Sequence, residues 1–372
     1  MKNALIIILS LAIGVGLGYS IALGISYIVD GSEAAGGIDK MKMVMAVGIA
    51  LVALFVSFFA NTILHEAGHL VAGLMTGYRF LSFRIFNLTL QKEDDGVHVK
   101  KFGISGTLGQ CLMAPPEGDD VPYFWYNAGG LLVNLAIICV SGLLLFLVDL
   151  PIIPFSLCIM LLATGGWLFI MNAVPVAVGG VPNDGKNILT LWRHPEQRIN
   201  FRNMLAVAAE QGCGRRLMDM PEQWFESEPL TKKSSVMEMS ARNLTYMRLM
   251  DEMRFDEARS ITEEFTMLGN AVPQLFQMEI ASDGLLLELL TKGREDVVDR
   301  LWTKKQQRYV KAYAKYMPLK MATLFAYEFI HNHDAEAARK YHDELIAKQD
   351  KYTQPGEARM AIALIEWILA NK

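Results

Sequence analysis

Four long intervals without a charged residue constrain this chain more than any other feature of its sequence. They cover residues 3–29, 43–64, 121–148 and 150–183. A helix needs about 20 apolar residues to cross a bilayer, and each interval reaches that length. Residues 183–372 carry 55 of the 74 charged side chains. The sequence therefore predicts an α-helical polytopic membrane domain with about four transmembrane helices over residues 1–190, and a soluble domain over residues 191–372.

The basic residues predict the orientation of these helices. The loop over residues 78–120 carries Arg79, Arg84, Lys92, Lys100 and Lys101. Cytoplasmic loops are enriched in Lys and Arg, and acidic residues count little toward this rule. With four crossings, both termini share the side of this loop. We therefore expect a multi-pass protein of the cell membrane whose C-terminal domain is cytoplasmic. The first apolar run exceeds the length of a signal-peptide core, which favours a retained helix.

Charge and cysteine content exclude two other classes of protein. The net charge is −4, so no basic surplus points to nucleic acid as a partner. The four cysteines are widely spaced and form no Cys-x-x-Cys motif. Cys139 and Cys158 lie in apolar stretches, which favours buried thiols. A secreted scaffold held by disulfides is therefore excluded.

A short motif at the end of the second apolar interval predicts the chemistry. It reads His65-Glu66-Ala67-Gly68-His69. Four helical residues rotate by about 400°, so the two imidazoles lie on one face about one turn apart. Such a pair can bind zinc, and the adjacent Glu66 can accept a proton from water that the metal activates. The alternative is a pair of helix histidines satisfied by their neighbours. Ionisable groups at the edge of a membrane helix are costly and usually functional, which favours zinc-dependent hydrolysis.

A catalytic zinc site needs a third protein ligand, and Asp184 is the best candidate. It follows the fourth apolar interval and emerges on the same side as His65 and His69 in the four-crossing arrangement. An alternative is that Asn183 or Asp184 caps the helix that begins near Lys186. The rival carboxylates lie in a polar loop and are Glu117, Asp119 and Asp120.

These motifs resemble the site-2 protease family of intramembrane zinc metalloproteases. Three elements match in order: HEAGH at 65–69, AGGLLVN at 128–134, and the segment 172–185 with its Asn, Pro and Asp-Gly. The family's second element is usually Gly-Pro-x-x-x-Asn, and Gly130 stands in place of the proline. Its third element is usually more compact, so the connection over residues 176–182 is longer than expected. The resemblance covers residues 41–190.

The resemblance implies one catalytic Zn²⁺ held by His65, His69 and Asp184, with Glu66 as the general base. It also places Asn134 near the zinc, where its amide can hydrogen-bond the substrate carbonyl or its oxyanion. The alternative for Asn134 is a hydrogen bond between helices, which is common in membrane bundles. Gly129 and Gly130 are expected to be close-packing residues.

The loop between the first two motifs predicts a hairpin. Residues 80–101 alternate apolar and polar side chains, and Asp94-Asp95-Gly96 interrupts the alternation. The resemblance places a small sheet beside the active site here, where a strand edge could hold an extended substrate. The alternative is an ordinary amphipathic hairpin at the membrane surface. The glycine-rich residues 103–109 are expected to be a loop.

The C-terminal half predicts a helical-repeat domain. Three segments, at residues 254–261, 294–301 and 334–341, align with a period of 40 residues. Acidic, small or apolar, and large apolar positions coincide among them. This pattern is typical of stacked helical hairpins of the tetratricopeptide (TPR) kind, although the usual period is shorter. A domain of this kind can bind a protein partner. No PDZ-like signature is present.

We therefore expect an intramembrane zinc endopeptidase that cleaves a transmembrane or signal-peptide-derived segment of a membrane protein, as in regulated intramembrane proteolysis. Its partners are the lipid bilayer, a membrane-protein or peptide substrate and a protein bound to the repeats. One alternative is a non-catalytic receptor or scaffold with a structural metal. Another is a zinc transporter, but intervals 3–29 and 121–148 carry no further set of metal ligands.

Overall fold

The computed structural model describes residues 18, 22, 26, 40–93, 96–101, 108–118, 120–178 and 181–372. The chain divides into two compact units. The first unit consists of Met1–Thr76, Pro122–Val176 and Pro182–Leu189. The second unit consists of Gly77–Val121, Ala177–Val181 and Thr190–Lys372.

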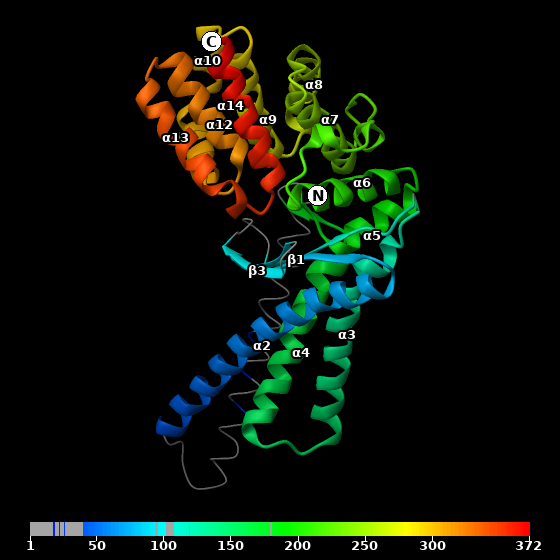
Figure 1. Cartoon of the computed structure of the whole chain (residues 1–372). Helices are drawn as coiled ribbons and strands as arrows, with labels where there is room; N and C mark the ends of the chain where they lie inside the picture. The colour runs from blue at the N-terminus through cyan, green and yellow to red at the C-terminus, as the bar shows by residue number, and fades with distance from the viewer. Residues whose placement is uncertain are drawn as a thin grey trace. The chain divides into compact units, whose positions relative to one another are not determined.

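Three long apolar helices form the first unit. They are α2 (Lys40–Met75), α3 (Tyr123–Leu147) and α4 (Ile152–Ala173), and each packs against the other two (Figure 1). All three are long and apolar enough to cross a membrane. They correspond to three of the four expected spans. The remaining expected span, residues 3–29, falls almost wholly outside the described residues.

Small and polar side chains set the spacing of these helices. Gly68 on α2 and Gly129 on α3 face each other so closely that a Cβ atom at either would lie within 2.4 Å of the other's backbone oxygen. Asn61 on α2 is fully buried and donates from Nδ2 to Thr164 Oγ1 (2.8 Å) and to Leu161 O (3.1 Å) on α4. Small residues and interhelical hydrogen bonds replace the hydrophobic effect where helices pack in lipid. These contacts hold the C-terminal half of α2 between α3 and α4.

The cysteines agree with the prediction in all but one respect. All four are free thiols, and Cys158 is buried on α4. Cys139 was expected to be buried, and that expectation is wrong because it is exposed on α3. An apolar residue of a membrane helix can face lipid instead of protein, so an apolar sequence does not by itself predict burial within the protein.

A four-stranded antiparallel sheet belongs to the second unit. Its order is β3-β2-β1-β4, with bounds β1 (Arg79–Ile85), β2 (Leu88–Glu93), β3 (Gly96–Lys101) and β4 (Gly109–Ala114). Glu93 pairs with Gly96, as expected for the predicted hairpin. Strand β4 was not predicted, because its short uncharged sequence lacks a clear alternation. It begins at Gly109, so the expected loop over residues 103–109 is wrong at that residue, and residues 103–107 lie outside the described part of the chain. The sheet groups with the C-terminal helices rather than with the apolar ones, and Gln91 Nε2 donates to Thr353 O (2.8 Å).

The C-terminal half of the chain is helical, with one two-stranded ribbon before it. That ribbon pairs β5 (Ala177–Val178) with β6 (Val181–Pro182). The helices are α5 (Asp184–Arg193), α6 (Gln197–Gly212), α7 (Val236–Asp251), α8 (Phe255–Leu268), α9 (Gln274–Leu290), α10 (Glu295–Leu301), α11 (Lys304–Tyr313), α12 (Pro318–Ala326), α13 (Ala335–Lys348) and α14 (Pro355–Asn371). Short helical turns are η1 (Leu217–Asp219), η2 (Glu222–Phe225), η3 (Gly269–Ala271), η4 (Tyr327–His331) and η5 (Gln349–Lys351).

The 40-residue period corresponds to three helix starts. The first position of each aligned segment is the N-cap of a helix: Arg254 for α8, Arg294 for α10 and Asp334 for α13. The fifth position is buried in every segment, as Ala258, Val298 and Ala338. Each of these helices packs against a preceding one, in the pairs α7–α8, α9–α10 and α12–α13. The 40-residue period therefore arises because a helix start, followed four residues later by a buried side chain, recurs three times.

A group of buried charges lies among α9, α12 and α14. Lys320 is 1% exposed, and its Nζ lies 2.5 Å from Glu279 Oε2 and 3.3 Å from Asp283 Oδ1. Glu357 is also buried and accepts a hydrogen bond from the backbone N–H of Leu319 (3.4 Å). Burial raises the pKa of Glu357 to about 7, although this hydrogen bond and Lys320 oppose the shift. The folded protein therefore holds a proton on Glu357 that the unfolded chain releases at lower pH.

We expect the folded state to lose stability as the pH rises from about 5 to 8. The pKa of Glu357 is higher in the folded state, so the folded protein binds more protons than the unfolded chain in this window and the free energy of unfolding falls with pH. Glu357→Gln is expected to remove about 2 kcal/mol of this pH dependence. Thermal unfolding of the full chain in detergent at pH 5.5 and pH 8 tests this. Equal pH dependence in both proteins contradicts the role of Glu357.

Candidate metal centre

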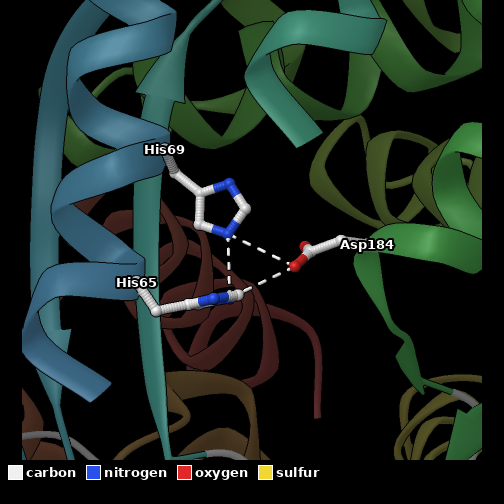
Figure 2. A group of neighbouring side chains, drawn as sticks. All are labelled: His65, His69 and Asp184. Atoms are coloured by element: carbon white, nitrogen blue, oxygen red, sulfur yellow. Dashed lines mark hydrogen bonds and ion pairs between the residues drawn. The ribbon is translucent and has the colours of Figure 1, made fainter. Parts of the chain in front are cut away.

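Two imidazoles and one carboxylate meet in the first unit. Figure 2 shows His65 and His69 extending from α2 toward Asp184 at the start of α5. Oδ2 of Asp184 lies 3.2 Å from Nε2 of His65 and 3.4 Å from Nε2 of His69. The two Nε2 atoms are 3.2 Å apart. Within the described part of the chain, this is the group of His, Cys, Asp and Glu side chains whose donor atoms could hold one metal ion.

Hydrogen bonds on the far side of each ring orient the two histidines. His65 Nδ1 donates to Asn134 Oδ1 (2.6 Å), and His69 Nδ1 donates to the backbone oxygen of Tyr126 (2.8 Å). A neutral imidazole that donates from Nδ1 carries a lone pair on Nε2. In the neutral form, in which histidine binds a metal, both rings direct these lone pairs toward Asp184. Metal-binding histidines are held in this way by partners beyond the metal.

The spacing of the three atoms fits a zinc ion. In a tetrahedral site with Zn–N and Zn–O bonds near 2.0–2.1 Å, neighbouring ligand atoms lie about 3.3 Å apart. The distances among His65, His69 and Asp184 are 3.2, 3.2 and 3.4 Å. Three nitrogen and oxygen atoms this close repel one another unless a proton or a metal cation lies between them. Two imidazoles and a carboxylate are a ligand set found in catalytic zinc sites.

Asp184 is held as an ionised carboxylate. Burial alone would raise its pKa, but the positive charge that the imidazoles of His69 and His65 carry when no metal is bound holds that pKa below its usual range. An ionised carboxylate offers the negative charge that a divalent cation needs. The electrostatics of the group are therefore consistent with the role of a metal ligand.

Asn183 fixes the position of Asp184. Its Nδ2 donates to Met171 O and Val174 O, both at 2.7 Å. Its Oδ1 accepts from the backbone N–H groups of Val176 (3.2 Å) and Lys186 (2.9 Å). The helix is thus capped by Asn183, one of the two residues proposed for that role, and the carboxylate of Asp184 is left to face the imidazoles.

The same contacts accommodate the long connection before Asp184. The backbone N–H of Asn183 donates to Val176 O (3.1 Å), and β5 pairs with β6 between these two residues. The extra length therefore does not displace Asp184. Gly185 also packs tightly here, since a Cβ atom would lie 2.1 Å from Ala173 O at the end of α4.

The other expected site residues lie close to this group. Glu66 is buried at 8% exposure and interacts electrostatically with His69. Asn134 is fully buried, and its Oδ1 accepts from His65 while its Nδ2 has no hydrogen-bond partner among the described residues. Of the rival carboxylates, Glu117 and Asp120 are exposed and belong to the second unit. Asp119 lies outside the described residues.

Three residues that support this site were not identified from the sequence. Tyr126 contributes only a backbone oxygen, which any residue could supply. Asn183 was seen only as a possible helix cap, and its two contacts to the end of α4 depend on how the chain folds back. Gly130 was expected to be a packing residue, but a Cβ atom there would lie 2.5–2.7 Å from atoms of His65 and His69.

We expect Gly130→Ala to prevent zinc binding while leaving the helices folded. The added methyl group would overlap both imidazoles, which cannot move without breaking their bonds to Asn134 and Tyr126. Zinc content of the purified protein and its helical circular dichroism measure the two effects. Gly142→Ala on the same helix is the control, because its Cβ would meet Leu162 Cδ1 at an ordinary 3.5 Å. Normal zinc content in Gly130→Ala contradicts the geometry.

The arrangement can position a divalent metal beside a carboxylate that is not one of its ligands. Glu66 follows His65 directly and lies next to His69, yet the group of three donor atoms does not include it. A carboxylate in this position can exchange protons with a water that a metal activates. No protein-family model, curated protein or solved structure matches this chain.

Proposed function

We propose that this chain is an intramembrane zinc endopeptidase of the site-2 protease kind. One observation carries the proposal: His65, His69 and Asp184 converge at distances suited to zinc, next to the buried Glu66. The two histidines and Glu66 lie on a helix long and apolar enough to cross a membrane. A peptide bond within a membrane segment is therefore the expected substrate. An unwound stretch of that segment would be needed, because a helical backbone is closed to attack.

Each residue has a defined role in this proposal. His65, His69 and Asp184 would hold the zinc, which lowers the pKa of water and polarises a carbonyl. Glu66 accepts the proton of the attacking water and then donates it to the leaving amine. Asn134 holds the His65 ring through Oδ1. Its Nδ2 is buried and unpartnered among the described residues, and is thus available to donate to the developing oxyanion.

The proposal extends to the architecture around this site. We propose four membrane crossings, of which α2, α3 and α4 are three, in a multi-pass protein whose C-terminal unit is cytoplasmic. The regular helix starts at Arg254, Arg294 and Asp334, each with a packed preceding helix, support a TPR-like repeat. Such a repeat could bind a protein partner or a substrate.

Removal of the metal tests the proposed activity. The full chain in detergent is incubated with synthetic transmembrane peptides that carry helix-breaking residues near the centre, and cleavage is followed by mass spectrometry. We expect 1,10-phenanthroline to slow cleavage about a hundredfold or more, and zinc to restore it. The non-chelating isomer 1,7-phenanthroline is the matched control.

Two outcomes would contradict this assignment. Cleavage that survives the complete loss of zinc would exclude a metal-dependent mechanism. If the protein binds zinc but cleaves neither synthetic membrane segments nor membrane proteins of the cell that produces it, the receptor or scaffold with a structural metal is the better assignment. Comparing membrane peptides in cells with wild-type protein and with Glu66→Ala extends the test to natural substrates.

A further inference from the structure

A cleft of about 770 Å³ lies within the second unit, formed by helices of the C-terminal half. Its lining comes from Glu196, α6, η2, residues 226–229, Ser234, α7 and α8. Four buried apolar side chains contribute to the lining: Phe225, Ala241, Leu249 and Ile261. Clefts that bind ligands typically have volumes of roughly 300–1,000 Å³. The size and the apolar lining suit a few side chains of a bound peptide.

The cleft presents free negative charge. Glu222, Glu226 and Glu228 line it and are exposed, and none of the three forms an ion pair with any residue that the structure describes. An exposed, unpaired carboxylate gives a potential that attracts cations to a cleft. Here three such carboxylates lie on one stretch of seven residues, 222–228, along one side of the cleft.

The arginines of the cleft do not offset this charge, because each is already engaged. Arg242 forms an ion pair with Glu264, outside the lining, and Arg248 does so with Glu252 (2.7 Å). Arg254 binds both Glu252 (2.8 Å) and Glu257 (2.7 Å). Arg248 is held further by Met220 O (2.8 Å) and lies over the ring of Phe225. The cleft thus offers free carboxylates and no free guanidinium group.

We propose that this acidic cleft binds a peptide segment rich in lysine and arginine with interspersed apolar residues. The free carboxylates complement the basic side chains, and the apolar lining receives the others. A nucleic acid or an anionic lipid surface would be repelled by the same carboxylates. Membrane proteins carry an excess of Lys and Arg beside their spans on the cytoplasmic side. On the basis of the proposed function, the ligand is this juxtamembrane segment of a membrane-protein substrate.

Tethering of this kind would select substrates without taking part in the chemistry. A substrate held by its basic segment has a raised effective concentration at the protease. The cleft would then discriminate among membrane segments that are equally easy to unwind. Its contribution would be to substrate affinity rather than to the rate of the chemical step.

Direct binding to the full chain tests the cleft apart from any cleavage. A fluorescein-labelled peptide that alternates Lys-Lys with Leu is titrated against detergent-solubilised Glu66→Gln protein, and anisotropy gives Kd. The triple variant Glu222→Gln/Glu226→Gln/Glu228→Gln is expected to weaken binding about tenfold, or roughly two- to threefold for each carboxylate. The same peptide with Glu in place of Lys should not bind. Thermal unfolding verifies that each variant is folded.

A matched triple variant controls for general electrostatics. Glu295→Gln/Glu336→Gln/Glu366→Gln changes the net charge equally at exposed positions that do not line the cleft. It should change Kd less than twofold. Equal weakening by both triple variants, or no weakening by the first, would overturn the inference. So would photo-crosslinks from a benzophenone on the peptide that fall outside residues 196–261.

The two proposals can fail separately. Charge-dependent binding that maps to the cleft, in a protein that cleaves nothing, supports the cleft and overturns the protease alone. Zinc-dependent cleavage whose KM and kcat are the same with the first triple variant, for substrates with and without a basic segment, overturns the cleft alone. A rise in KM limited to substrates with a basic segment, with kcat unchanged, supports both.

Discussion

Glu66→Gln is expected to retain zinc and to lower the rate of peptide hydrolysis by about 100- to 10,000-fold. Glutamine has nearly the same size and shape as glutamate, but it cannot accept the proton of the attacking water. The three proposed zinc ligands remain in place, because Glu66 is adjacent to them and not among them. Zinc analysis of the purified variant and single-turnover cleavage of a membrane peptide measure the two effects on the same sample.

Glu117→Gln is the matched control for this experiment. It makes the same chemical change at an exposed position of the second unit, and it should alter neither zinc content nor rate. If Glu66→Gln kept more than about a tenth of the wild-type rate, the proton acceptor would be another group. If it lost its zinc, Glu66 would have to be a ligand, and the role of Asp184 would need revision.

Asp184→Ala is expected to weaken zinc binding by at least about a hundredfold and to abolish cleavage with it. The substitution removes the carboxylate that lies within 3.4 Å of both Nε2 atoms and leaves two imidazoles, which hold zinc weakly on their own. Competition with a chelator of known affinity gives the zinc dissociation constant. Added zinc at high concentration should restore little activity, since the geometry around the metal has changed.

The loop carboxylates provide the comparison for Asp184. Asp120→Ala is expected to keep full zinc content, because that side chain is 84% exposed and pairs with Arg198 at 3.6 Å. Asp119→Ala, which tests the other rival from the sequence, is also expected to keep it. Loss of zinc in Asp119→Ala with full retention in Asp184→Ala would place the third ligand in that loop. Full retention in all three would mean that two imidazoles suffice, or that the third ligand is elsewhere.

Features that depend on a few consecutive residues could be predicted from the sequence. The placement of His65 and His69 on one face follows from helical periodicity, and the existence of three long apolar helices follows from length and charge alone. Their bounds do not, because α2 continues to Met75 and α4 ends at Ala173. The 40-residue period marks helix starts because capping and the first core position are local. The alternation over residues 80–101 predicts the hairpin for the same reason.

Contacts between residues that are far apart in the sequence were decided only by the tertiary structure. Asn134 orients His65, Gly130 leaves room for both imidazoles, and Asn183 holds the segment that carries Asp184. The free carboxylates of the cleft also depend on tertiary contacts, as does the grouping of the sheet with the C-terminal helices. Periodicity is set by bond geometry over one or two turns, and the sequence displays it directly. Contacts across tens of residues depend instead on how helices pack and how loops close, which local patterns do not specify.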